Sequence, residues 1–188
     1  MDHRFLIAIV IAVIVLLAAW FMAGYFARRR RTELLQRRFG PEYERAVREI
    51  GTNRAEATLL EREKRVEKLS IRELTPDERE RFITEWRLVQ LRFVEAPHEA
   101  VIDADRLVEQ LMATRGYPVT NFEQRAADIS VDHPRVVDNY RAAHQIALRH
   151  RHGEATTEDL RKAILYYRSL FDDLLHTELV ATNRREVA

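Results

Sequence analysis

Residues 5–26, FLIAIVIAVIVLLAAWFMAGYF, form an uninterrupted apolar run without a charged side chain. A helix of this length covers roughly 33 Å, enough to cross a hydrocarbon core of about 30 Å. The run is longer than the apolar region of a cleaved signal peptide, the leader at residues 1–4 has no clear positive excess, and no small-x-small cleavage pair ends the run. The sequence therefore predicts a single-pass transmembrane helix at 5–26 that also acts as the signal anchor.

Basic residues follow this run closely. Arg4 alone precedes it, whereas a cluster opposed only by Glu33 comes soon after it: Arg28, Arg29, Arg30, Arg31, Arg37 and Arg38. Because positive flanks stay in the cytoplasm, we expect an inner-membrane protein with a cytoplasmic C-terminal domain. The alternative is an exported periplasmic or cell-surface domain. Arg28, Arg29, Arg30 and Arg31 are also candidates for contact with anionic lipid headgroups.

Small residues recur along the apolar run. Helical spacing places Ala8, Ala12, Ala19 and Ala23 within one narrow stripe. Small residues on one face let two membrane helices approach closely. Self-association through this stripe is therefore a hypothesis for the oligomeric state.

The composition favours helices throughout. The chain of 188 residues has a formal net charge of +1, with 46% hydrophobic and 32% charged residues, and only five Gly and five Pro. This balance predicts an all-α protein and argues against a nucleic-acid-binding face. The absence of cysteine excludes a disulfide, a thiol nucleophile and a thiolate metal site.

The region after the apolar run divides into three parts. A basic juxtamembrane linker is expected at 27–41, where Gly40 and Pro41 interrupt any helix that leaves the bilayer. Residues 42–74 are densely charged and free of proline, so they predict one long, exposed stalk helix. Residues 75–181 predict a small bundle of about four to five amphipathic helices, and 182–188 a disordered tail.

Caps and apolar stripes define the helices of the bundle. Thr75, Pro76 and Glu78 form a capping box that opens a helix to about residue 95. Further helices are expected at 97–115, at 122–129 after the box-like Thr120 to Glu123, at 134–151, and from a Thr156 or Thr157 cap onward. Apolar residues at helical spacing predict the core, and the longest such stripe is Leu160, Ile164, Tyr167, Phe171 and Leu174.

Four segments carry a resemblance to a known group of proteins: RFGPEYERAVRE (38–49), REKRVEKLSIREL (62–74), RGYPV (115–119) and FEQRAADISVDHPRVVDNYRAAHQIALR (122–149). Over residues 37–175 the chain resembles a widespread family of uncharacterised bacterial proteins, often labelled hypothetical or secreted. The resemblance implies no activity, ligand or site residue.

Side chains suited to chemistry crowd together between residues 125 and 144. We take as candidate ligand-binding residues Arg125, Asp128, Asp132, His133, Arg135 and His144. If these groups converged in a helical cleft, they would suit anion binding or acid–base work. Each also has a structural explanation, because Asp132 or His133 would cap a helix at Pro134 and Arg125 would pair with Asp128.

No metal, cofactor or catalytic residue is predicted. Glu95 and His98 have a proline between them, Asp173 and His176 stand alone, and His150 and His152 point to different helix faces. The chain also lacks a phosphate-binding glycine loop and a nucleophile elbow.

The sequence therefore predicts a non-catalytic interaction or scaffold module that is held at the inner membrane and binds an unidentified protein or itself. The first alternative is a sensor of a small molecule or anion, with possible catalysis, built on residues 128–144. A second alternative is an exported helical domain.

Overall fold

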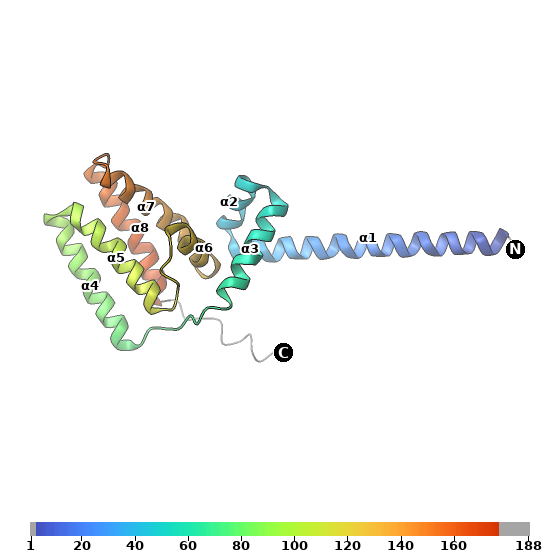
Figure 1. Ribbon diagram of the computed structural model, residues 1–188, viewed down its shortest axis with the longest axis horizontal. Coiled ribbons are helices and arrows are strands. Elements are labelled where there is room, and N and C mark those ends of the chain that lie inside the picture. Colours follow the sequence, from blue (N-terminus) through green and yellow to red (C-terminus); the bar gives the residue numbers. More distant parts are fainter. Residues whose placement is uncertain (1–2, 177–188) are drawn as a thin grey trace.

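The computed structural model describes residues 3–176, and it describes side chains from Leu16 onward. Over these residues the chain forms eight α-helices and no strand, so the all-α prediction is confirmed. Helix α1 (His3–Phe39) extends from the body as a long rod, and the other helices gather at its C-terminal end (Figure 1). The tail at 182–188 lies outside the described residues.

Among the described residues, no helix is long and apolar enough to cross a membrane. The side chains of residues 5–15, which form the first part of the predicted span at 5–26, lie outside that description. The transmembrane helix therefore stays a prediction.

The end of α1 packs with two short helices, α2 (Pro41–Ile50) and α3 (Thr52–Val66), to form a unit that we call the base. Leu35 and Phe39 of α1 are buried there against Tyr43 and Ala46 of α2 and three residues of α3: Ala55, Leu59 and Val66. Residues 27–39 of the predicted linker are thus a continuous part of α1, and the linker's only break is the Gly40–Pro41 turn.

The prediction of one long stalk helix over 42–74 is corrected by the structure. Gly51 has a φ of 77°, a left-handed conformation that glycine adopts without strain, and it ends α2 and precedes α3. The two helices pack against each other as a hairpin, which buries Tyr43, Ala55 and Leu59. The apolar residues of this segment therefore face each other and α1.

The remaining five helices form the bundle: α4 (Pro76–Glu95), α5 (Pro97–Thr114), α6 (Phe122–Asp132), α7 (Val137–Arg151) and α8 (Thr157–His176). The capping box at Thr75 is present, and Thr156 makes the same reciprocal contacts with Asp159 at the start of α8. Asn121, instead of Thr120, caps α6. Helix α6 extends beyond the predicted residue 129, and α7 begins later than predicted.

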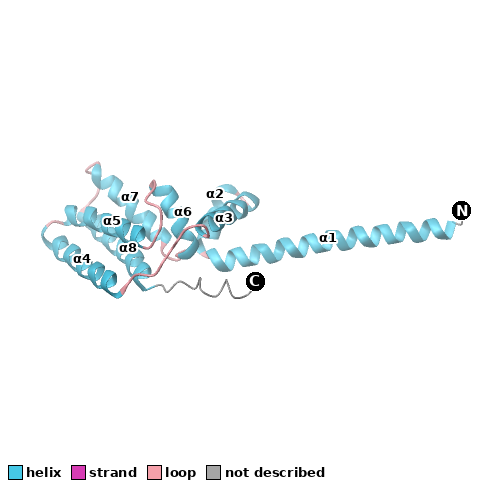
Figure 2. Cartoon of the chain, turned by 60° about the horizontal axis from the view of Figure 1, so that its bottom comes forward, coloured by secondary structure: helices cyan, strands magenta, loops and turns pink. Residues whose placement is uncertain are grey.

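The bundle has one continuous apolar core. Helices α5, α7 and α8 pack at its centre, and α4 packs on α5. Trp86 of α4 reaches α8, where its ring stacks on Phe171 with the centroids 4.7 Å apart. In both views α6 lies between the bundle helices and the base, while α4 lies on the side far from α1 (Figures 1 and 2). The order from the rod outward is therefore base, α6, and then the rest of the bundle.

Candidate functional site

The six predicted ligand-binding residues do not form one site. Arg125 is buried, and its Nε donates to the Tyr140 hydroxyl at 2.9 Å. Its other nitrogens contact the Glu109 carboxylate at 2.6 Å and the Thr120 carbonyl at 3.2 Å. Burial raises the pKa of Tyr140 despite the neighbouring Arg125 charge, so this hydroxyl stays neutral. Arg125 thus ties α6 to α5 and α7, and the predicted pair with Asp128 is replaced by these contacts.

Asp128 faces the base instead. Asp128 is 1% exposed, and its carboxylate accepts from Arg65 Nε of α3 at 2.8 Å and from the Gln124 side chain at 2.9 Å. Arg125 and Asp128 are thus one turn apart on α6 but have different roles. Arg125 connects helices within the bundle, and Asp128 connects the bundle to the base.

His144 lies in a third environment. Its ring stacks on Phe122, with centroids 3.6 Å apart and planes 5° apart. Burial lowers the pKa of His144, although Asp105 opposes this shift. A neutral, stacked imidazole is the role expected of a histidine that packs at the edge of the core.

The turn between α6 and α7 brings three of the predicted residues together. Asp132, His133 and Arg135 line a shallow hollow of about 390 Å³ with Val131 and Pro134 and with residues from other helices: Arg37, Arg38 and Asp173. His133 is 1% exposed, and its Nδ1 lies 2.5 Å from the Asp173 carboxylate. Its buried Nε2 has no hydrogen-bond partner among the described residues.

Asp132 and His133 do not have the predicted capping role. Helix α7 begins at Val137 without a side-chain cap, and Asp132 accepts a hydrogen bond from the Tyr117 hydroxyl at 2.9 Å. Arg135 is exposed at the mouth of the hollow. The hollow therefore keeps half of the predicted set and adds Arg37 and Arg38, which sequence analysis had assigned to membrane topology.

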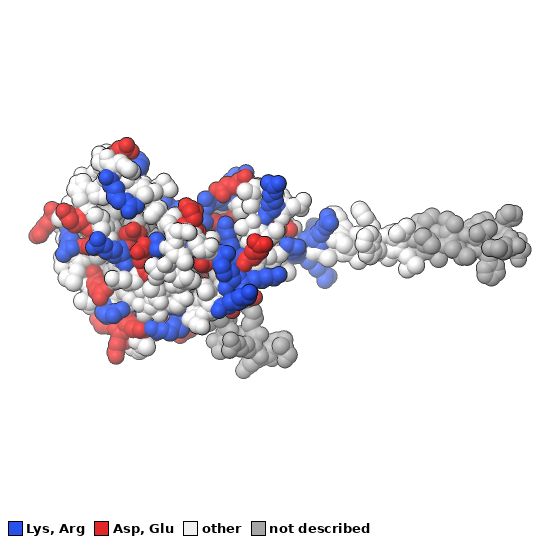
Figure 3. Space-filling model, in the orientation of Figure 1, with Lys and Arg blue, Asp and Glu red and all other residues white. Residues whose placement is uncertain are grey.

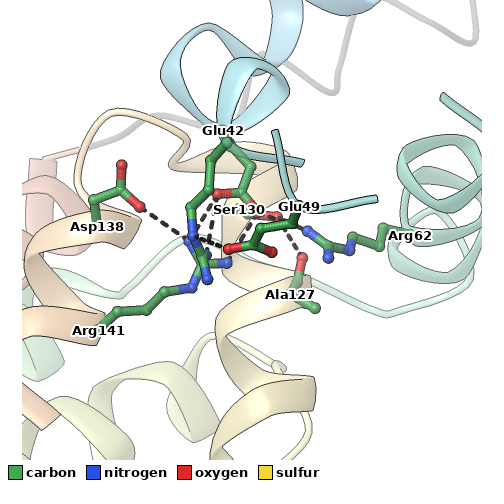
Figure 4. Close-up of polar contacts among 8 residues, drawn as sticks. Glu42, Glu49, Arg62, Ala127, Ser130, Asp138 and Arg141 are labelled. Carbon is green, nitrogen blue, oxygen red and sulfur yellow. Dashed lines mark hydrogen bonds and ion pairs between the residues drawn. The ribbon is translucent and has the colours of Figure 1, made fainter. Parts of the chain in front are cut away.

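A buried polar cluster that the sequence analysis did not predict surrounds Glu42 on α2. Glu42 is 1% exposed, and its carboxylate accepts from Arg141 of α7 at 2.7 and 2.9 Å and from Arg62 of α3 at 2.7 Å. Figure 4 shows Glu42 flanked by these two arginines, with Asp138 beside Arg141 and Ser130 near Arg62.

Charge balance in this cluster depends on Glu42. Burial alone would raise the pKa of the Glu42 carboxyl, but the hydrogen bonds and charges of Arg141 and Arg62 outweigh it and hold this pKa below its ordinary value. Glu42 therefore stays ionised between Arg62 and Arg141, and Arg45 lies 3.7 Å from the same carboxylate. We call the contacts of Glu42, Arg62, Arg65, Asp128 and Arg141 the joint, because they connect the base to the bundle.

The outer part of α1 carries the predicted lipid-contact residues. Arg28, Arg29, Arg30 and Arg31 are all exposed, and Figure 3 shows basic side chains gathered where α1 leaves the body. On their N-terminal side, Leu16, Trp20 and Phe21 are 69%, 77% and 75% exposed. Ala19 and Ala23 of the small-residue stripe are exposed too, whereas the side chains of Ala8 and Ala12 lie outside the described residues.

Metal ligands are sparse in the part of the chain that the structure describes. No group of three or more His, Asp or Glu side chains there is arranged to hold a metal ion. His98 and His150 do meet, with their Nδ1 atoms 3.3 Å apart and their ring centroids 4.7 Å apart.

Comparison of the chain with protein-family models, with curated proteins and with solved structures finds no match. The resemblance to a family of uncharacterised bacterial proteins therefore stays a prediction.

Proposed function

We propose that this protein is a membrane-anchored interaction or scaffold module whose helical bundle lies at the cytoplasmic face of the bacterial inner membrane. The observation that carries the proposal is the exposed apolar part of α1. None of the helices that the structure describes covers the large side chains there, and each is more than half exposed: Leu16, Leu17, Trp20, Phe21, Met22, Tyr25 and Phe26. A contiguous apolar surface of this kind is unfavourable in water and is typical of contact with lipid or protein.

The way α1 joins the body supports a positioning role. The helix continues without a break from the apolar run to Phe39, which is fully buried in the base. Phe26 and Phe39 are therefore roughly 20 Å apart along one rigid helix. An anchor of this kind would hold the base at a defined height and orientation above the bilayer, which a flexible linker would not do.

The surface of α4 supports the interaction role. Leu88, Leu91 and Val94 are 61%, 68% and 82% exposed, and α4 lies on the side of the bundle far from α1. Three large apolar residues at helical spacing on an edge helix offer a surface for another protein. The predicted sensor site receives less support, because its six residues face four different environments.

Membrane attachment is tested by extracting bacterial membranes with alkaline carbonate. We expect the full chain to stay in the membrane pellet and the double variant Leu16→Arg, Leu17→Arg to leave it, because each arginine near the centre of a span costs about 3 kcal/mol. Leu88→Arg with Leu91→Arg is the matched control, since it makes the same change on α4. Complete extraction of the unmodified chain would contradict the anchor.

Orientation is tested with one cysteine, because the chain has none of its own. Glu154 is exposed in the turn between α7 and α8, so Glu154→Cys is accessible to an impermeant maleimide. Labelling only after lysis is the expected result. Labelling of intact cells would support the alternative of an exported domain.

A second candidate function is the binding of an anion in the hollow at the turn between α6 and α7. Arg37 and Arg135 are exposed at this hollow, and the buried Nε2 of His133 lacks a partner among the described residues. Two such arginines suit a phosphate-like anion. Inorganic phosphate should then raise the melting temperature of the full chain, and Arg135→Gln should abolish the rise while Arg87→Gln, an exposed arginine of α4, should not. An equal rise in both variants would remove this candidate.

A further inference from the structure

A groove runs along α1 at the point where this helix leaves the base. Its volume is about 900 Å³, and α3 forms its second wall. Apolar side chains cover most of its surface: Ala23, Phe26, Ala27, Leu34, Leu35 and Leu60. The charged residues of the groove are Arg30, Arg31, Arg38 and Glu63. Its lining is thus apolar with a positive centre.

The positive charge of the groove is only partly compensated. Arg38 forms an ion pair with Glu63, and Arg31 lies 3.9 Å from Glu56. Arg30 is exposed and makes no ion pair among the described residues. The groove therefore complements a negative charge near Arg30 and Arg31.

The order of these residues along α1 defines the shape of a matching ligand. Ala23, Phe26 and Ala27 lie on the side of the apolar run, and Arg30 follows Ala23 by roughly 10 Å along the helix axis. The small side chains of Ala23 and Ala27 leave room for a chain beside the helix. A ligand with an apolar tail and an anionic head, arranged in the same order, would fit both parts.

We infer that this groove binds an anionic phospholipid. One acyl chain lies along Ala23, Phe26 and Ala27, and the phosphate lies between Arg30 and Arg31. Leu34, which is 67% exposed, and Leu60 cover the phosphate from the side of the base and exclude water, which strengthens its attraction to the arginines. This inference rests on the proposed membrane anchor.

Charge also decides against a second copy of α1 as the occupant. Two copies anchored in one membrane are parallel, so pairing along this face would bring Arg30 against Arg30 and Arg31 against Arg31. Like charges at a helix contact are unfavourable. A lipid phosphate compensates the same arginines instead.

The test uses the full chain in nanodiscs of phosphatidylcholine, alone or mixed with phosphatidylglycerol, and counts retained phosphatidylglycerol by native mass spectrometry. Arg30→Gln with Arg31→Gln should lower retention roughly tenfold or more, since each arginine contributes about 1 kcal/mol. Arg28→Gln with Arg29→Gln removes the same charge next to the groove but outside its lining. This variant measures the general attraction of the basic segment to an anionic surface, and it should lower retention by a smaller factor than the groove variant.

Two further arms separate the remaining explanations. Ala23→Leu with Ala27→Leu fills the apolar part while keeping every charge, and should lower retention as well. Inorganic phosphate should not displace the lipid, because it lacks the tail; displacement would point to a free phosphate site.

Equal losses in both arginine variants, or equal retention of the two lipids, would overturn the inference. Carbonate extraction of the same variants keeps this outcome distinct, because every variant should remain in the membrane if the anchor proposal holds.

Discussion

In the bundle core, Trp86 stacks on Phe171 within an apolar cluster drawn from all five bundle helices, whereas at the joint Glu42 lies between Arg62 and Arg141. Apolar contacts have no fixed direction, so a core tolerates changes that preserve volume. A buried ion pair needs each partner in place, and the loss of one leaves the other uncompensated. The comparison implies that the joint sets the orientation of the base and is sensitive to single charges.

The two regions also differ in what they contribute to stability. Burial of large side chains dominates the free energy of folding, so most of it should reside in the bundle. Replacement of a buried ion pair by apolar residues is often neutral, so the pair itself adds little. We therefore expect the joint to matter for the placement of the bundle relative to α1 more than for its folding.

The largest effect is expected in the bundle core. Phe171→Ala removes a side chain that is 1% exposed and stacked on Trp86, and should lower the free energy of unfolding by about 4 kcal/mol. Urea unfolding followed by circular dichroism measures the change. Leu165→Ala, on the exposed side of the same helix, is the control and should cost less than about 1 kcal/mol. Similar costs for both variants would mean that the apolar core does not dominate the bundle.

The second largest loss of unfolding free energy is expected at the joint, in the variant Glu42→Gln. This change keeps the shape of the side chain but leaves Arg62 and Arg141 without their shared counter-charge, and should cost about 3 kcal/mol. Glu44→Gln is the matched control, because Glu44 is exposed on the same helix. The double variant Glu42→Met, Arg141→Met removes both charges and should cost less than Glu42→Gln alone. A greater loss in the double variant would show that the pair stabilises the fold directly.

The bundle could be predicted from local patterns. Leu160, Ile164 and Phe171 recur at helical spacing, and all are buried. The capping boxes at Thr75 and Thr156 need only residues within one turn, so short-range chemistry identifies them. Where residues that interact are close in the sequence, the sequence is sufficient to predict the helix and its buried face.

The joint could not be predicted in this way. Glu42 and Arg141 are 99 residues apart, and nothing in their local sequence links them. The dense charge of residues 42–74 is typical of a solvated helix, which made the base look like an exposed stalk. The signal against a single helix was Gly51, whose left-handed conformation turns the chain.

The prediction that six residues between 125 and 144 form one site was wrong for a related reason. Residues 125–144 are close in sequence, but α6 lies between two regions with different partners. Arg125 contacts α5 and α7, Asp128 contacts α3, and His144 packs on Phe122. Only the turn after α6 keeps neighbours together, and there Asp132, His133 and Arg135 share a hollow.

A smaller effect is expected where the segment between α3 and α4 passes the end of α5. Gly116 has a φ of +96°, and a Cβ added there would lie 2.4 Å from the Ser70 carbonyl oxygen. Gly116→Ala should cost about 2 kcal/mol in urea unfolding, because strained backbone and a backbone clash combine. Gly153→Ala is the control, since Gly153 has a φ of +75° and a Cβ added there would meet nothing within 4 Å. Its cost should be about 1 kcal/mol, from strain alone. Equal costs would mean that Ser70 moves away freely.

The smallest effect is the pH dependence of the unfolding free energy. It distinguishes stabilisation by the charge of Glu42 from stabilisation by burial of Phe171. Because the pKa of Glu42 is lower in the folded chain than its ordinary value of 4.5, its stabilisation is fully present above about pH 4.5 and is lost as the pH falls through the folded value. Glu42→Gln has no such contribution. The difference in unfolding free energy between the unmodified chain and Glu42→Gln should therefore be constant from about pH 7 to pH 5 and shrink below about pH 4.5. The corresponding difference for Phe171→Ala should not follow this curve, because burial of an aromatic ring does not titrate. A Glu42→Gln difference that stayed constant into acid would show that shape, and not charge, holds the joint.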